Sequence, residues 1–164
     1  MDSGKFVFIS DQYYEDFQDK HLMQNKEVVV GAIHDCPCFF AFRDSVTPEI
    51  LWLVPISSNY VKYKMLYDKK VRRYGKCNTI WFGEVLGRQA AFLIQNMCPV
   101  TEHYIREVYV DKNGIPIQID GRIVDDVIKN AREVLAITKR GAQIVFPDIS
   151  AIHTALCEQL AKSK

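Results

Sequence analysis

Two serines and a lysine lie where an apolar segment of the chain gives way to a polar one. The apolar stretch ends at Pro55-Ile56, Ser57 and Ser58 follow, and Lys62 comes about one helical turn later. Ser58 or Asn59 is suited to cap the start of a helix. A helix N-terminus offers unpaired N–H groups and the positive end of a dipole, which together bind phosphate. The spacing is compatible with a phosphate site, and a capped helix without a ligand is the alternative.

The segment after the serines is strongly basic. Between residues 62 and 76 there are seven basic side chains and one acid, Asp68, although the whole chain has a net charge of only +1. A solvated helix face normally alternates acids with bases to form i,i+4 pairs, and this one does not. We therefore expect a phosphate-rich partner here, with a solvated face as the alternative. The basic residues are Lys62, Lys64, Lys69, Lys70, Arg72, Arg73 and Lys76.

These residue types indicate which chemistry is available. One reaction open to such groups is the cleavage of RNA without a metal. In that reaction the ribose 2′-hydroxyl attacks the neighbouring phosphorus, and the catalyst must stabilise the negative charge of the transition state and protonate the leaving oxygen. Lysines and hydroxyls can do both. No carboxylate cluster indicates a two-metal nuclease. The run His34-Asp35-Cys36-Pro37-Cys38 lacks the second ligand pair of a structural zinc site, so we interpret it as a strand edge. We expect neither a metal nor a cofactor.

Hydrophobic periodicity and turn residues predict the elements that position these groups. Gly75 is expected to end the basic helix, and Asn113-Gly114 predicts a hairpin. Together the elements predict one compact α+β domain over residues 1–164, with an inserted basic helix and two C-terminal helices. The expected strands span residues 5–10, 27–33, 38–43, 50–56, 79–85, 88–95, 105–110 and 115–119, and the expected helices span 12–20, 59–74, about 120–140 and a last segment after Pro147-Asp148.

Composition excludes several classes of protein. The 164 residues contain 48% hydrophobic and 25% charged residues, which are ordinary values for a globular domain. No apolar run approaches the ~20 residues needed to span a bilayer, and no segment is typical of a secretion signal. The five cysteines are an odd number without a framework spacing, which favours free thiols in a reducing compartment. We therefore expect a cytoplasmic protein that does not bind membranes.

Several short motifs follow one another in a specific order along most of the chain. Taken together they resemble the type III toxin–antitoxin family of ToxN and AbiQ, and most closely its CptN branch. The motifs are Lys5-Phe6-x-x-Ile9-Ser10-x-x-Tyr13, Gln24-Asn25-Lys26 before Gly31, Pro55-Ile56-Ser57-Ser58, Tyr63-Lys64 through Lys76-Cys77-Asn78-Thr79-Ile80, Phe82-Gly83-Glu84-Val85-Leu86-Gly87, and Ala91-Phe92-Leu93-Ile94-Gln95-Asn96-Met97.

The resemblance implies a fold, an activity and a partner. The implied fold is an antiparallel SH3-like β-barrel similar to the Kid and MazF toxins, with added helices. The implied activity is metal-independent endoribonuclease cleavage that leaves a 2′,3′-cyclic phosphate, in a toxin of the kind that acts in abortive infection. The implied partners are target RNA and a repeated pseudoknot RNA, which the toxin processes and which inhibits it in a toxin–RNA hetero-oligomer. No protein antitoxin is expected.

The resemblance also implies roles for individual residues. It places Tyr13, Lys26, Ser57 and Ser58 in the active-site groove, with the serines on the scissile phosphate and Lys26 assisting. The ToxN branch has a lysine where this chain has Tyr60, so we expect the nearest lysine, Lys62, to stabilise the transition state or protonate the leaving oxygen. The residues expected to contact RNA are Tyr13, Tyr60, Lys64, Lys69, Arg72, Arg73 and Lys76.

Two alternative functions remain open at this stage. The same basic helix would serve a non-catalytic RNA-binding regulator. A type II toxin similar to MazF, held by a protein antitoxin, would share the expected fold.

Overall fold

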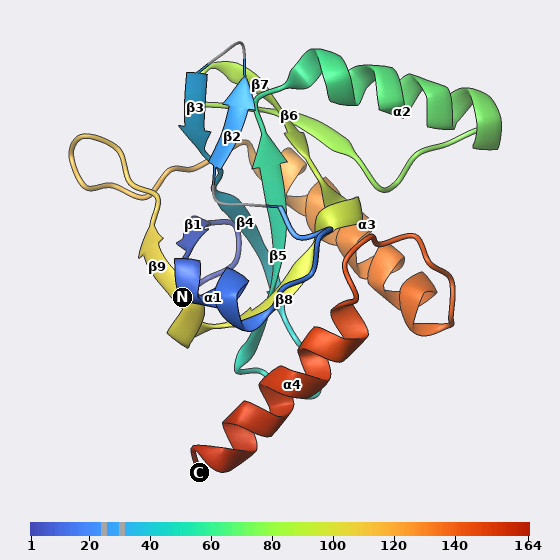
Figure 1. Cartoon of the computed structure of the whole chain (residues 1–164). Coiled ribbons are helices and arrows are strands. Elements are labelled where there is room, and N and C mark those ends of the chain that lie inside the picture. The colour runs from blue at the N-terminus through green and yellow to red at the C-terminus, as the bar shows by residue number, and fades with distance from the viewer. Residues whose placement is uncertain (24–25, 30–31) are drawn as a thin grey trace.

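The computed structural model describes residues 1–23, 26–29 and 32–164, with side chains for residues 1–23 and 36–164. Most strands lie in the first two thirds of the chain, and two helices end it (Figure 1). The strands are β1 Phe6–Ile9, β2 Lys26–Val29, β3 Ala32–Asp35, β4 Cys38–Arg43, β5 Ile50–Ser57, β6 Trp81–Val85, β7 Arg88–Phe92, β8 Cys98–Thr101 and β9 Ile105–Val108. The helices are α1 Asp11–Asp16, α2 Tyr60–Tyr74, α3 Gly121–Lys139 and α4 Ile149–Lys162, with 3-10 turns η1 Ile94–Asn96 and η2 Glu102–Tyr104.

Seven of these strands form one antiparallel sheet, in the order β6-β7-β5-β4-β1-β9, with β8 also paired to β5. The central strand β5 is an unbroken buried run, which is typical of a strand covered on both faces. Its first half pairs with β8, and its last residues, Ile56 and Ser57, pair with Phe92 and Ala91 of β7. Strands β2 and β3 form a separate hairpin that starts with Lys26 opposite Asp35.

The two faces of β5 belong to different hydrophobic clusters, because successive side chains of a strand point to opposite faces. Trp52 and Val54 pack in the cluster that also contains Val127 and Val134 of α3. Leu51 and Leu53 pack in the cluster that contains Tyr13 of α1 and Leu156 of α4. The sheet is therefore covered by α3 on one face and by α1 and α4 on the other (Figure 1).

The prediction of an α+β fold with an antiparallel sheet, an inserted helix and two C-terminal helices is confirmed. The pairings of the described strands do not close the sheet into a ring, and the SH3-like barrel stays a prediction. Helix α2 begins and ends within one residue of the expected 59–74, and Gly75 adopts the left-handed conformation with φ 82°.

Four predicted elements differ from the structure. The expected strand 27–33 is instead the hairpin of β2 and β3, and the expected strand 88–95 ends at Phe92 and continues as η1. Residues 115–119 make only one bridge, between Val110 and Pro116, because proline has no N–H to donate to a ladder. The first helix spans Asp11–Asp16 only, and strand β8 was not predicted.

Candidate functional site

The end of β5 and the start of α2 form a tightly bonded turn. Ser57 is buried with 2% of its surface exposed, and its Oγ accepts a hydrogen bond from the N–H of Asn59 at 3.1 Å. Ser58 is exposed. The N-cap of α2 is Asn59, whose side chain accepts from the N–H of Lys62 at 3.4 Å. The serines therefore shape the turn before the helix, and Asn59 performs the capping.

A cleft of about 450 Å³ opens beside this turn. Ser57 and Ser58 line it, together with the exposed Arg88 and Gln89 at the start of β7. The apolar part of the lining comes from strands β1, β5, β6 and β7 and from the segments beside them. The lining residues are Phe8, Cys36, Pro37, Ile56, Ser57, Ser58, Val85, Leu86, Arg88, Gln89, Ala90 and Tyr109.

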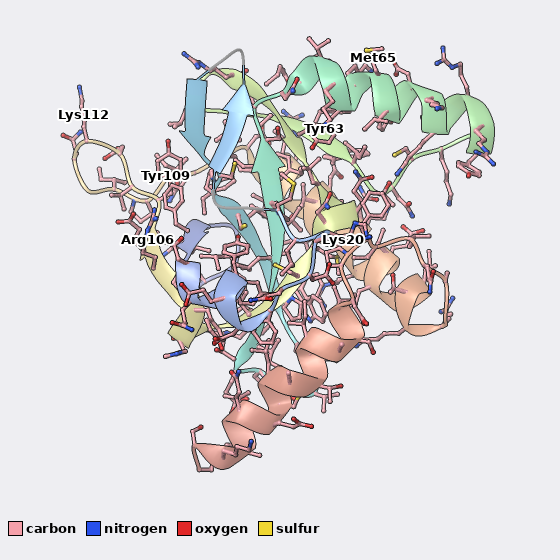
Figure 2. The ribbon with its side chains drawn as sticks, viewed as in Figure 1. Lys20, Tyr63, Met65, Arg106, Tyr109 and Lys112 are labelled. Carbon is pink, nitrogen blue, oxygen red and sulfur yellow. The ribbon has the colours of Figure 1, made fainter. Side chains whose placement is uncertain are left out.

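Aromatic side chains form one wall of the cleft. The rings of Phe8 and Tyr109 are tilted against each other with centroids 5.2 Å apart. The guanidinium carbon of Arg106 lies 5.0 Å from the Phe8 ring centroid, which is within the range of a cation–π contact. Figure 2 shows Arg106 and Tyr109 on the same side of the molecule, from β9 and the loop that follows it.

The turn between β6 and β7 also lines the cleft, through Leu86. Leu86 and Gly87 have φ of 54° and 77°, the positive values that a tight two-residue hairpin turn requires. A leucine rarely adopts this conformation, and backbone strain of this kind clusters at functional sites. The turn places Arg88 immediately at the start of the next strand. Its backbone pairs with Val85 of β6, but the guanidinium of Arg88 forms no hydrogen bond or ion pair with any side chain that the structure describes.

Of the two expected catalytic lysines, only Lys62 has a described side chain. Lys62 is exposed on α2 with its Nζ 5.1 Å from the Tyr63 ring centroid, and it is not among the cleft residues. Lys26 starts β2, but its side chain lies outside the described part of the chain. Among the described residues, the basic side chain that lines the cleft together with the serines is Arg88, which the sequence did not point to. The expected role of Lys62 beside the serines stays a prediction.

Tyr13 does not lie in the cleft either. Its ring is fully buried, with 0% exposed, and its hydroxyl donates to the carbonyl of Pro99 at 2.9 Å. Burial raises the pKa of this hydroxyl well above its usual value. The expectation that Tyr13 contacts RNA is wrong in this conformation, because the side chain is a packed core residue between Phe17 and Tyr104.

Helix α2 has a packed face and an exposed face. Tyr63, Tyr67 and Val71 recur at helical spacing and pack against the sheet. The ring centroids of Tyr60 and Phe82 lie 5.3 Å apart. Tyr74 continues the helical spacing of Tyr63, Tyr67 and Val71, but it is exposed. In Figure 2, Tyr63 points toward the body of the protein and Met65 points away from it.

The basic residues of α2 fall into two groups. Lys64 pairs with Asp68 at 3.0 Å, and this hydrogen bond raises its pKa. Lys70 also has partners inside the protein. It is half-buried, and its Nζ donates to Thr79 Oγ1 at 2.9 Å and to Gln95 Oε1 at 2.8 Å. Burial lowers the pKa of Lys70. The residues with exposed side chains are Lys62, Lys69, Arg72, Arg73 and Lys76, so the predicted basic surface exists and its contact with RNA stays a prediction.

The described residues contain no group of three or more His, Cys, Asp or Glu side chains arranged to hold a metal ion. None of the described helices has the length and apolar character to cross a membrane. No model of a known protein family matches the chain, and a search of curated proteins finds no match. The family resemblance therefore stays a prediction that rests on the motifs.

Proposed function

We propose that this protein is an endoribonuclease that cleaves RNA without a metal, in the cleft formed by Ser57, Ser58 and Arg88. One observation carries the proposal: Ser57, Ser58 and Arg88 line the same 450 Å³ cleft, and the Arg88 guanidinium has no partner among the described side chains. An arginine without an internal partner presents its N–H donors to a ligand, and phosphate oxygens match the geometry of those donors.

The groups around the cleft fit the parts of a dinucleotide step. Arg88 stabilises the extra negative charge that develops on the phosphate in the transition state, and Ser58 donates a hydrogen bond to the same oxygens. Unstacked bases of single-stranded RNA stack on aromatic side chains, and Phe8 and Tyr109 offer such a surface. The 2′-oxygen loses its proton to solvent and attacks the phosphorus as the bond from phosphorus to the 5′-oxygen breaks. The 5′-oxygen takes up a proton from solvent, and a 2′,3′-cyclic phosphate remains on the other fragment.

The exposed basic side chains of α2 extend the surface available to RNA, since this helix starts at the cleft. Phosphate contacts of this kind position a nucleic acid and add affinity without reading its bases. We further propose that the chain is a type III toxin inhibited by a repeated pseudoknot RNA. That part of the proposal is supported by the sequence resemblance and not by the cleft.

The experiment is a single-turnover cleavage assay with purified protein, a mixed-sequence single-stranded RNA and excess EDTA. The parent protein should produce fragments that end in a 2′,3′-cyclic phosphate. Arg88→Ala should lower the cleavage rate about 10²-fold or more, because a donor to the transition state is lost. Ser58→Ala should lower it by a smaller factor with unchanged circular dichroism. Lys62→Ala is the matched control, since this cation starts the same helix outside the cleft.

Each alternative has its own outcome. RNA binding without any product would identify a non-catalytic RNA-binding regulator. Cleavage that requires magnesium would contradict metal-independent chemistry. Cleavage in which Lys62→Ala has the large effect and Arg88→Ala has none would move the reaction out of this cleft. The toxin part fails separately if expression of the active enzyme without its neighbouring RNA leaves growth unaffected, or if a protein encoded beside it is the inhibitor.

A further inference from the structure

A second chemically suggestive cluster lies on α4, where a thiol, an imidazole and a carboxylate follow one another in a line. Cys157 Sγ lies 3.7 Å from His153 Nδ1, one helical turn away on the same helix. His153 Nε2 lies 3.3 Å from Asp44 Oδ1. Because the thiol and the carboxylate lie near opposite nitrogens of one ring, the three groups follow the order of a nucleophile, its base and the group that orients the base.

Asp44 is held rigidly in the charged form. It is 4% exposed and accepts hydrogen bonds from Trp52 Nε1–H at 3.0 Å and from the N–H groups of Val46 and Thr47 at 3.2 and 3.0 Å. Burial opposes ionisation, but these hydrogen bonds outweigh it and hold the pKa of Asp44 below its usual value. The carboxylate therefore presents a fixed negative charge to His153.

This charge determines which nitrogen of His153 carries the proton. Nε2 is shielded from solvent, and although it is close to Asp44 its angle is not that of a hydrogen bond within the described residues. An ionised carboxylate accepts and cannot donate, so it favours the proton on Nε2 and leaves the lone pair of Nδ1 facing Cys157. The ring cannot easily turn away, since it stacks on Trp52 with an interplanar angle of 13°.

The remaining cysteines have the opposite environment. Cys36, Cys38, Cys77 and Cys98 are buried, and Cys157 is partly exposed. Burial raises the pKa of Cys38 well above its usual value and that of Cys98 to about 12. Buried thiols of this kind are inert, because the thiolate is the nucleophile. Cys157 therefore combines solvent access with a base.

We propose that Cys157 is a modification site that reacts selectively with small disulfides, with His153 as its base and Asp44 as a positioning residue. In the reaction the Cys157 thiol transfers its proton to His153 Nδ1, and the thiolate attacks one sulfur of the disulfide. A new S–S bond forms to Cys157 as the S–S bond of the reagent breaks, and the released thiolate takes the proton from His153. Cys157 is oxidised and one half of the reagent is reduced.

The site is independent of the RNA cleft. In Figure 1, α4 and α2 lie at opposite ends of the molecule. The charged groups that face His153 are Asp44, from the loop after β4, and Lys139 at the end of α3, which lines the same small cavity as His153.

The test follows the modification of each cysteine by dithiodipyridine in the intact protein, with peptide mapping by mass spectrometry. At about pH 6 an ordinary thiol is almost entirely protonated and reacts slowly. We expect Cys157 to be modified faster in the folded protein than in the same protein unfolded by urea, whereas the other four cysteines react more slowly when folded. Slower reaction of Cys157 in the folded protein would overturn the proposal, and this comparison needs no variant.

Variants then separate a base from mere exposure. His153→Gln keeps a polar group opposite Asp44 and removes the nitrogen that faces Cys157, so the rate should fall about tenfold or more. Asp44→Asn should raise the pH at which modification reaches half its maximal rate, which a purely structural role of Asp44 would leave in place. Cys77→Ser is the matched control and should leave the rate at Cys157 unchanged. A His153→Gln protein that reacts at the parent rate shows an exposed thiol and no base.

Discussion

Ser57 and Ser58 are neighbours in sequence, but their hydroxyls are not equivalent. Ser57 is buried, and its Oγ already accepts the N–H of Asn59, so its first role is to shape the turn. Ser58 is exposed at the margin of the cleft, where its hydroxyl can rotate toward a ligand. The proposed chemistry therefore depends on Ser58 and Arg88 directly and on Ser57 through the geometry of the turn.

Asp44 allows a prediction about stability and pH. Its pKa in the folded protein is lowered, so it stabilises the fold at a pH above the unfolded value of about 4, and this contribution is lost as the pH falls through the folded value. Asp44→Asn should lower the free energy of unfolding at neutral pH by about 1–3 kcal/mol, because charged acceptors are replaced by a neutral amide. Urea denaturation over a range of pH values measures this difference.

The difference in unfolding free energy between Asp44→Asn and the parent should begin to shrink below about pH 4 and should be smallest below the lowered folded pKa of Asp44, where both side chains are neutral. Glu49→Gln is a suitable control, since Glu49 is exposed and its one ion pair among the described residues is with Lys164, at 3.8 Å. A constant difference between Asp44→Asn and the parent at every pH would show that the charge of Asp44 contributes nothing.

At the scale of elements, α2 shows how much local sequence determines. Its start and end were predictable because Asn59 caps the first turn and Gly75 adopts a left-handed conformation after the last, both of which are local effects. Its buried and exposed faces were largely predictable from periodicity, with Tyr74 as the exception. The internal hydrogen bonds of Lys70 were not predictable, since Thr79 and Gln95 approach it only through the tertiary fold.

The strands show the limit of local signals. Strand β8 is a short segment, Cys98–Thr101, that contains a proline, and its pairing with Ile50–Leu53 joins distant parts of the chain. The hairpin of β2 and β3 was predicted as one strand because Val28-Val29-Val30 is a continuous β-branched run and only Gly31 indicates a break. Propensity identifies such segments as extended but does not show where they pair.

The exposed basic face of α2 carries a prediction that belongs to the helix as a unit. Replacing Lys69, Arg72 and Arg73 together by glutamine should weaken RNA binding for all sequences and flatten its dependence on salt. Each lost phosphate contact lowers the slope of log K against log salt by about 0.7 for a single strand. The cleavage position should not change, because backbone contacts do not read bases. A salt titration of binding measures the slope.

The control removes the same charge from other helices. Lys129, Lys139 and Lys162 are exposed on α3 and α4, and their triple replacement by glutamine changes the net charge equally. This control should keep the parent slope. If both triple variants lose the same slope, net charge alone attracts RNA, and if neither does, the exposed face of α2 is only solvated.

At the scale of the whole molecule, β5 joins the candidate site to both halves of the core. Its end carries Ser57, its pairing with β7 brings Arg88 and Gln89 to the cleft, and its two faces pack in different hydrophobic clusters. This explains why sequence reasoning identified the serines and missed Arg88. The serines follow an apolar strand within the sequence, whereas the position of Arg88 depends on a pairing between segments more than thirty residues apart, such as Ser57 and Ala91.

Because β5 is shared, the clusters on its two faces should unfold together. Leu156 of α4 is fully buried in one cluster, and its replacement by alanine should lower the free energy of unfolding by about 2–5 kcal/mol. Trp52 and Trp81 pack in the other cluster, beside α3, but Trp52 also stacks on His153 of α4, so it is the fluorescence of Trp81 that reports on the opposite face. In Leu156→Ala, tryptophan fluorescence and helical circular dichroism should still change at one common urea concentration, lower than in the parent.

Met65→Ala, on the exposed face of α2 with 69% of the residue accessible, is the matched control and should shift the midpoint little. Separate transitions for the two signals in Leu156→Ala would show that α4 unfolds by itself and that β5 does not couple the two faces.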